Sequence, residues 1–196
     1  MKSKYLPPIL RRVAALGHVV FDSGDFDLNL IGVRSPSRQP DRWDDEFMVV
    51  WKQGGVWRQL AAQATTDPGG WWLINGQKAT AIMVPGQYRG VYKIDLHAGK
   101  YPALCQRGGV VRVYRDGNKN QVLDHDPATI TEGYFGINIH RASAHHGDTK
   151  IVGKYSAGCT VIRNPEDFRD IMELARTQIA THPDWAETFT YTLIEG

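Results

Sequence analysis

The chain has 196 residues, of which 42% are hydrophobic, 10% aromatic and 22% charged, a composition typical of globular rather than disordered proteins. Its 23 Lys and Arg residues exceed its 21 Asp and Glu residues by only two, and the charges are interspersed. This balance argues against nucleic acid as a partner. The length predicts a single domain over residues 1–196 that forms a core without a metal or disulfides.

The chain contains two cysteines, Cys105 and Cys159, too few for a disulfide-rich scaffold. Their surroundings match no zinc or redox spacing motif, and a single bridge between them is disfavoured. No apolar run approaches the roughly 20 residues that a membrane-spanning helix needs. We therefore expect no transmembrane segment, no metal and no cofactor.

The first residues are expected to form an amphipathic helix over about 5–16 that ends at Gly17. Arg11 and Arg12 interrupt the apolar run, and no small-residue cleavage site follows, which favours a helix over a secretory signal. Without a secretory signal, the protein is expected to be made in the cytoplasm. The sequence does not determine the oligomeric state, for which a monomer is the expectation. Any action outside the cell would need release or non-classical export.

From residue 18 onward, short β-branched and aromatic runs alternate with turns rich in Gly and Pro, a pattern typical of β proteins. Gly54-Gly55 between two such runs indicates a hairpin, whereas residues 35–45 and 65–72 are expected to form a loop and a turn. The predicted strands cover residues 18–21, 26–35, 47–53, 56–60, 79–84, 90–96, 110–114, 136–140, 159–162 and 189–194.

A second helix is predicted over about residues 165–180. Asn164 is suited to cap its first turn, Pro165 fits the first helical position, and Glu166 and Asp167 complement the helix dipole. The apolar residues recur at helical spacing and form a core-facing stripe. The sequence thus predicts a mainly β, α+β domain that is predominantly antiparallel, with a helix at its N-terminus and one after Cys159.

The segment from Gly136 to Ile162 carries the strongest chemical signal. Cys159 follows Ala157 and Gly158, which leave room for a substrate and allow a sharp turn that aims backbone N–H groups at one point. His140 ends a predicted strand, and a polar loop leads from there to the cysteine. A histidine beside a cysteine can take the thiol proton and leave a nucleophilic thiolate. From the residues alone, a buried structural cysteine with a structural histidine is the commoner case.

The string His140, 15 further residues and then Ser156-Ala157-Gly158-Cys159 resembles the signature of the L,D-transpeptidase catalytic domain (YkuD-like) family. In that family a His is followed at about this distance by Ser or Thr, any residue, Gly and the nucleophilic Cys. The resemblance covers residues 134–172. The stretch 85–106 resembles a divergent branch of the same family that is associated with phages or prophages. This family resemblance implies an antiparallel β sandwich with one helix after the catalytic cysteine.

The resemblance implies a role for each matching residue. Cys159 would attack an L,D peptide bond of a peptidoglycan stem peptide and form a thioester, with His140 as base and then as acid. Backbone N–H groups of Gly158 and Cys159 would stabilise the oxyanion, and Ser156 would fix the turn or hydrogen-bond near the histidine. The acyl group would pass to an amine in transpeptidation, or to water in hydrolysis.

The chain departs from the family pattern just after His140 and just after Cys159. Arg141-Ala142 stands where many members have Gly-Thr, and Val161 stands where many have Arg. Arg163 lies two residues on, on the same side of a strand as Val161, and is expected to substitute for the missing charge. The residues expected to contact the substrate are Arg163, Arg141, His97 and Tyr155.

Three other features predict chemistry less strongly. His145 and His146 are adjacent and match no zinc spacing, so a solvated loop that covers the site is expected. Residues 116–124 resemble a calcium loop but lack the Gly and terminal Glu of the EF-hand pattern, which favours a plain hairpin. Trp71-Trp72 between glycines is suited to stack on a sugar or peptide, although tryptophan more often serves the core.

Three functions compete on this evidence. The first is a cysteine enzyme acting on peptidoglycan peptides, with hydrolysis slightly favoured by the missing secretory signal. The second, motivated by Val161, is a non-catalytic wall-binding or phage structural module that keeps the fold. The third is a thiol peptidase of ordinary proteins, which needs only the same Cys and His. In an active site of this kind, Cys159 is expected to be ionised well below the usual thiol pKa of about 8.5.

Overall fold

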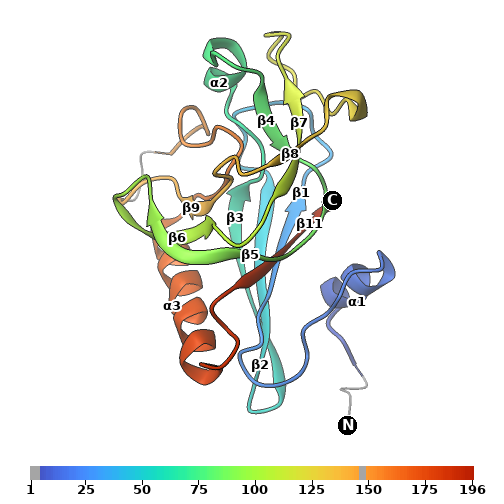
Figure 1. Ribbon diagram of the computed structural model, residues 1–196, viewed down its shortest axis with the longest axis vertical. Coiled ribbons are helices and arrows are strands. Elements are labelled where there is room, and N and C mark those ends of the chain that lie inside the picture. Colours follow the sequence, from blue (N-terminus) through green and yellow to red (C-terminus); the bar gives the residue numbers. More distant parts are fainter. Residues whose placement is uncertain (1–4, 146–148) are drawn as a thin grey trace.

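The computed structural model describes residues 5–145 and 149–196. Eight strands close into a barrel, and a separate three-stranded sheet lies beyond one end of it, at the top of Figure 1. Helix α3 runs along one side of the barrel, and helix α1 lies on the opposite side. The mainly β, α+β character predicted from the sequence is confirmed.

The barrel strands follow the order β1-β11-β5-β6-β9-β10-β3-β2, and β2 pairs with β1 to complete the ring. The hairpin β2–β3 turns at Gly54-Gly55, where both residues have positive φ, as the sequence predicts. The strand bounds are β1 (Asn29–Arg34), β2 (Asp45–Gln53), β3 (Val56–Thr65), β5 (Gly86–His97), β6 (Tyr101–Gln106), β9 (Ile139–Arg141), β10 (Thr160–Ile162) and β11 (Phe189–Glu195).

The predicted antiparallel sandwich is wrong, because this sheet closes on itself. Within the described residues, β1 pairs with β11 and β9 pairs with β10 in parallel, whereas the other barrel pairs are antiparallel. The pair β1–β11 joins the first and last strands of the chain. Closure gives every barrel strand two neighbours and so removes the free edges that a sandwich leaves.

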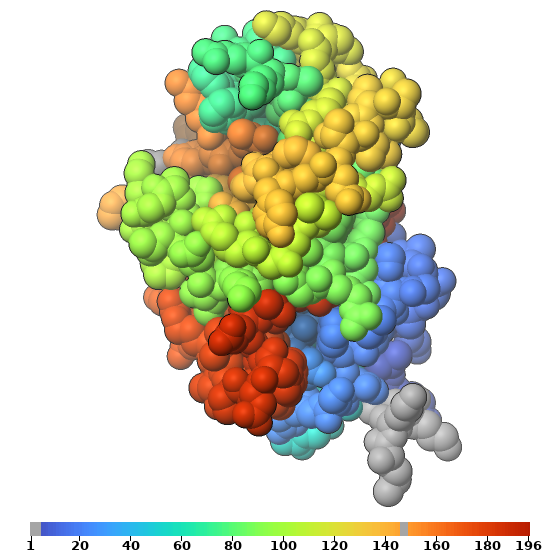
Figure 2. Space-filling view, viewed as in Figure 1, coloured from blue at the N-terminus to red at the C-terminus, as the bar shows by residue number. Residues whose placement is uncertain are grey.

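The second sheet has the order β4-β7-β8 and comprises β4 (Thr80–Met83), β7 (Val111–Asp116) and β8 (Thr131–Gly133). The short helix α2 (Gly70–Asn75) precedes β4, and the 3-10 turn η1 (Pro127–Thr129) precedes β8. Figure 2 shows these segments, in green and yellow, as the upper part of the molecule. The turn predicted at 65–72 is thus wrong in its second half, where α2 begins.

Helix α1 (Pro8–Ala15) lies within the predicted range and covers the outside of the barrel. Its buried residues Leu10 and Val13 pack with Ile31, Met48 and Ile194, which belong to β1, β2 and β11. Among the residues described, no helix is both long enough and apolar enough to cross a membrane.

Helix α3 (Pro165–Thr181) confirms the second predicted helix, including its cap. Asn164 Oδ1 accepts a hydrogen bond from the Glu166 N–H at 2.9 Å. Phe168, Ile171 and Met172 are buried and join the main core. The helix contacts β3, β9 and β10, so it supports the part of the barrel that carries His140 and Cys159.

Two local predictions fail for identifiable reasons. Residues 18–21 form no strand, since side chains take their backbone groups: the Phe21 N–H donates to Asn29 Oδ1 at 2.8 Å. Strand β6 was not predicted, because Pro102 argues against a strand. Pro102 pairs with Leu96 near the turn of the β5–β6 hairpin.

A fully buried arginine joins the barrel to the second sheet. Arg34 Nη1 and Nη2 donate to the backbone oxygens of Met83 and Thr66 at 2.8 and 3.1 Å. Its Nε donates to Thr66 Oγ1 at 3.0 Å. The same nitrogen forms an ion pair with Asp67 Oδ1 at 3.1 Å, although this oxygen accepts no hydrogen bond. Burial raises the pKa of Asp67 to about 7, against the opposing effect of the guanidinium. Arg34 therefore ties β1 to the end of β3 and to β4.

Replacing Arg34 with Met should lower the free energy of unfolding by about 3–5 kcal/mol, because buried acceptors lose their donors and Asp67 loses its counter-charge. The control is Arg11→Met, which removes an exposed arginine from α1 and should change stability by less than about 0.5 kcal/mol. Urea denaturation followed by tryptophan fluorescence measures both. Equal stability of the two variants would contradict the role assigned to Arg34.

Candidate functional site

The parallel pairing of β9 and β10 brings His140 and Cys159 to one face of the barrel sheet. The register sets Val161 opposite His140, so that Cys159, directly before β10, lies opposite Asn138. The Thr160 N–H donates to Asn138 O at 3.0 Å and extends the pairing to this point. Because side chains two residues apart share a face of a strand, Asn138, His140 and Cys159 lie on the same face.

A buried serine closes the turn that carries Cys159. Ser156 Oγ donates to Cys159 O at 2.8 Å and accepts from the Gly158 N–H at 3.1 Å. Gly158 has a φ of 121°, a conformation that side-chain-bearing residues rarely adopt. A Cβ at this position would also lie 2.3 Å from Ala81 O of β4. Position 158 therefore requires glycine both for its backbone angle and for the close approach of the second sheet.

One of the two expected oxyanion donors is already engaged in this arrangement. The Gly158 N–H is taken by Ser156 Oγ, so it does not point into open space. Another backbone donor is directed at the sulfur instead: the Asn138 N–H lies 3.4 Å from Cys159 Sγ. The thiol in turn donates to Gly136 O at 3.4 Å. The resting thiol proton is thus directed to a carbonyl rather than to His140.

The loop that leads to the cysteine is fastened to α2. Asp41 Oδ1 accepts hydrogen bonds from the Gly153 and Gly70 N–H groups at 2.6 and 2.9 Å. The Gly69 N–H donates to Ser156 O at 2.9 Å. A Cβ at Gly69 would lie 1.9 Å from Gly153 O, so the two segments approach this closely only because residue 69 is glycine.

The protonation of the His140 ring follows from its hydrogen bonds. Nδ1 lies 2.8 Å from Arg141 O, which can only accept, so Nδ1 carries a proton. In the neutral ring, Nε2 then has a free lone pair and can accept a proton. The Tyr101 hydroxyl, 3.3 Å from Nδ1, donates to the same carbonyl at 3.2 Å. Arg141 O and Tyr101 together fix the tautomer of His140.

Burial holds both members of the Cys159–His140 pair in their neutral forms. It lowers the pKa of His140 to about 3, with a further contribution from a charged form of His97. Cys159 is partly exposed, but protein atoms surround its thiol, and this burial raises the pKa to about 11. The sequence-based expectation of an ionised resting thiol therefore differs from the structure. A reaction at this site would need proton transfer during attack rather than a preformed thiolate.

His97, one of the predicted substrate contacts, packs directly on this pair. Its ring stacks on the His140 ring, with 3.9 Å between centroids and 20° between planes. His97 Nδ1 lies 3.0 Å from Asn138 Nδ2. Burial lowers the pKa of His97, and the charges of Lys100 and Arg107 lower it further.

Arg141 and Tyr155 each pack against a different neighbour of the pair. The Arg141 guanidinium lies over the Tyr101 ring, 4.4 Å from its centroid, in a cation–π contact beside His140. Tyr155 belongs to a small apolar cluster that also contains Cys159. Tyr155 thus packs in the cluster of Cys159, and Arg141 packs on the tyrosine that hydrogen-bonds beside His140.

Arg163 is engaged elsewhere. Its Nε donates to Thr149 O at 3.1 Å and its Nη1 to Gln63 Oε1 at 2.8 Å. Val161, which stands at the position of the family arginine, is fully buried against Trp43. The guanidinium of Arg163 is thus held at β3 and the preceding loop, and substrate binding by it would require these bonds to break.

Sequence reasoning missed three residues of the site: Tyr101, Gln106 and Asn138. Asn138 shares the strand face of His140, and this alternate spacing is the signal that was available. Tyr101 and Gln106 lie on β6, which was not predicted as a strand. Only the pairing of β6 with β9, through Leu104 and Ile139, brings them to His140 and Asn138.

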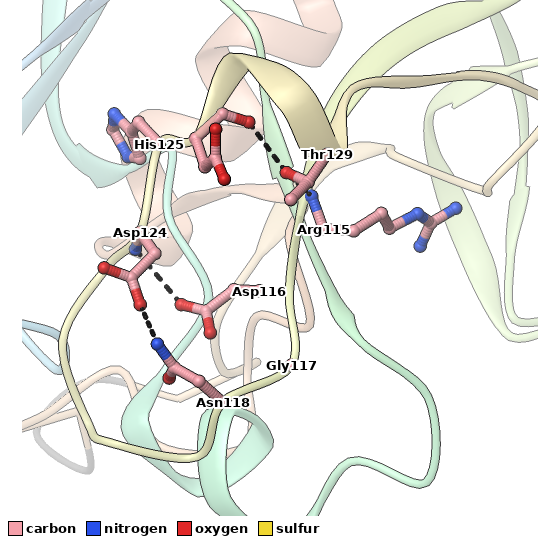
Figure 3. A pocket seen from close by; sticks show the side chains of 8 residues that line it. Arg115, Asp116, Gly117, Asn118, Asp124, His125 and Thr129 are labelled. Atoms are coloured by element: carbon pink, nitrogen blue, oxygen red, sulfur yellow. Dashed lines mark hydrogen bonds between the residues drawn. The ribbon is translucent and has the colours of Figure 1, made fainter.

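The segment 116–124 forms part of a cavity of about 630 Å³ in the second sheet (Figure 3). Its polar side chains bind one another: Asn118 Nδ2 donates to Asp124 Oδ2, and the Asp124 N–H donates to Asp116 Oδ2 at 3.1 Å. The ring of His125 stacks on Tyr114. In the described part of the chain, no group of three or more His, Cys, Asp or Glu residues is placed to hold a metal ion.

The other weaker candidates make contacts with residues outside the Cys159–His140 pair. His145 is exposed, and its N–H donates to Ser143 Oγ, whereas His146 lies outside the described residues. The Trp71 ring is partly exposed and carries the Lys154 ammonium 4.5 Å from its centroid. Both cysteines are free, so no bridge joins Cys105 to Cys159.

Replacing Gly158 with Ala should destabilise the fold by about 2–4 kcal/mol, because the added methyl group meets Ala81 O and the backbone angle is strained. Gly99→Ala is the matched control: Gly99 also has positive φ, 70°, but no atom lies within 4 Å of an added Cβ. It should cost only about 1 kcal/mol. Chemical denaturation compares them, and an equal loss in both variants would argue against the contact with β4.

Alkylation of Cys159 by iodoacetamide should be slow at pH 7 and rise about tenfold per pH unit towards pH 11, because the thiolate fraction grows this way below the pKa. Peptide mapping by mass spectrometry separates this reaction from that of Cys105. A short unstructured peptide with one internal cysteine is the reference, and its rate should level off above the ordinary thiol pKa of about 8.5. A rate at Cys159 that is already constant from neutral pH would show an ionised resting thiol instead.

No family model matches this chain, and no curated protein matches it either.

Proposed function

We propose that the chain is a cysteine enzyme of the L,D-transpeptidase type, which acts on L,D peptide bonds of peptidoglycan stem peptides through a thioester intermediate. The observation that carries the proposal is the placement of Cys159, on a glycine-dependent turn, beside the strand of His140, whose Nδ1 is fixed as a donor. The resemblance of the string His140 to Cys159 to the family signature supplies the substrate class.

The chemistry follows from two neutral partners. His140 Nε2 accepts the thiol proton as Cys159 Sγ attacks the carbonyl carbon, so charge separation develops only during the attack on the bound substrate. The electron pair of the carbonyl moves to its oxygen, and the protonated His140 then gives its proton to the leaving amine. Because Sγ at rest donates to Gly136 O, a rotation of the Cys159 side chain towards His140 precedes this step.

The backbone N–H of Asn138 is the candidate donor for the developing negative charge. It is directed at Cys159 Sγ, and a bound carbonyl oxygen near the sulfur would lie within its reach. Arg141 beside His140 offers a cation to a substrate carboxylate, which the stem peptides of peptidoglycan carry. These contacts favour a peptide with a free carboxylate over a neutral one.

A non-catalytic wall-binding module that keeps the fold is the second candidate. The raised pKa of Cys159 favours it, since an inert thiol is what such a module would have. The burial of Val161 at the position of the family arginine favours it too. The exposed edge of Trp71 would then be a binding element for the wall.

Incubation of the protein with disaccharide tetrapeptides, followed by mass spectrometry, tests the proposal. Wild-type protein should release the terminal D-amino acid or form cross-linked products, and Cys159→Ala should lose this activity by roughly a thousandfold or more. Cys105→Ala is the matched control, because it removes the other thiol of the chain, which is buried on β6 and donates to Asp95 O. It should retain the activity.

The products and controls separate the alternatives. Free D-amino acid without cross-links indicates hydrolysis, whereas new cross-links indicate transpeptidation. No product, together with retention of Cys159→Ala on insoluble peptidoglycan, would establish the binding module in place of the enzyme. Cleavage of all-L peptides would instead indicate a thiol peptidase of ordinary proteins.

A further inference from the structure

Two imidazole rings lie face to face beside the cysteine, and the proposed mechanism uses only one of them. His97 ends β5 and stacks on His140, which lies on β9, with centroids 3.9 Å apart. The two ring planes differ by 20°, so the rings are close to parallel. A ring in this position limits how His140 can tilt, and a charge on it would act on His140 at very short range.

The hydrogen bonds of Asn138 determine the protonation of His97. The Gln106 N–H donates to the Asn138 side chain at 2.9 Å, so the atom facing it must be the carbonyl oxygen, Oδ1. The amide nitrogen Nδ2 then faces His97 Nδ1 at 3.0 Å and donates to it. His97 Nδ1 therefore carries no proton, and the ring is the neutral tautomer with its proton on Nε2.

The two stacked rings thus have complementary tautomers. Arg141 O holds the proton of His140 on Nδ1, and Asn138 Nδ2 keeps the proton of His97 on Nε2. A proton added to His97 Nδ1 would point at the Asn138 amide N–H and break that bond. Protonation of His97 would also set a positive charge against the face of His140.

We propose that His97 is a positioning residue for His140: Asn138 locks it as a neutral ring that holds the plane of His140 and leaves His140 able to accept the thiol proton. The proposal rests on the proposed function. It assigns His97 a role through His140 rather than through contact with the substrate. When Cys159 Sγ–H breaks and the proton moves to His140 Nε2, the imidazolium forms against an uncharged aromatic face.

The charged groups around His97 act in the same direction. Lys100, in the turn after β5, and Arg107, directly after β6, are both cationic and oppose a charge on His97. Asp95 on β5 is paired with Arg107 at 2.6 Å. The rings of Tyr101 on β6 and His140 on β9 contact the His97 ring. Arg141 lies over the Tyr101 ring, and burial raises the pKa of the Cys105 and Cys159 thiols, which favours their neutral forms.

The tautomers are testable without any assay of activity. Two-bond nitrogen–proton correlation spectra of protein labelled with nitrogen-15 distinguish a protonated from an unprotonated ring nitrogen, and single His variants assign the signals. At pH 7 the Nδ1 of His97 and the Nε2 of His140 should be unprotonated. A proton on His97 Nδ1 at this pH would overturn the proposal.

The pH profile of peptide turnover tests the role itself. His97→Phe keeps a flat ring against His140 but cannot take a proton. The acid limb of the wild-type profile should follow protonation of His97, so in the Phe variant it should move to lower pH by roughly half a unit or more. His125→Phe is the matched control, because His125 also stacks on a ring, that of Tyr114, but in the second sheet. It should leave the acid limb unchanged.

Each further outcome decides one of the two proposals. Equal acid limbs in wild type and His97→Phe would overturn the role of His97 while leaving the enzyme proposal intact. A His97→Ala variant that folds and keeps the full rate would do the same, because it removes the ring. If wild-type protein turns over no peptide, the proposed function fails, and the nitrogen spectra alone then decide the assignment of His97.

Discussion

The parallel pairing of β9 with β10 is the constraint on which the site depends. It sets Cys159 opposite Asn138 and one diagonal position from His140, although 18 positions of sequence separate the cysteine from the histidine. A parallel pair needs a long connection between its strands, and residues 142–159 provide it here. Asp41 and the glycine contact with α2 hold the last part of this connection, so the turn at Cys159 is supported from the barrel and from the neighbouring helix.

Burial orders the site and at the same time keeps it uncharged. His140 is almost fully buried, which fixes its ring between Arg141 O and His97 but opposes its protonation. The same environment opposes ionisation of the thiol. An ordered and neutral pair favours general-base attack on a bound substrate over a free thiolate that reacts with any electrophile. Reactivity at such a site is coupled to binding, because only a bound carbonyl provides the acceptor for the developing charge.

The second sheet contributes to the site although it carries none of the reactive side chains. Ala81 O of β4 lies where a side chain at position 158 would be. The turn can therefore pack this closely against the second sheet only with glycine at position 158. Arg34 fastens the sheet to the barrel through Met83 O and the end of β3. The position of β4 therefore depends on a buried guanidinium more than 100 residues before the cysteine in the chain.

Local signals identified much of the framework. The Gly54-Gly55 hairpin, the capped helix α3 and the final strand follow from turn residues, capping residues and hydrophobic spacing, which act between near neighbours in the chain. Closure of the barrel does not follow from local signals, because an alternating strand pattern is the same for parallel and antiparallel partners. For the same reason the pattern does not distinguish a closed barrel from a sandwich.

By itself the sequence determined a mainly β domain, the glycine-dependent turn at Cys159 and the candidate pair with His140, since these depend on residue types and short spacings. Only the tertiary structure decided that His97 stacks on His140, that Asn138 and Tyr101 fix the tautomers, and that Arg163 is held by Thr149 and Gln63. These contacts join β3, β5, β6, β9 and β10 across long stretches of chain. Burial, which makes both reactive groups neutral, likewise arises only when those strands pack together.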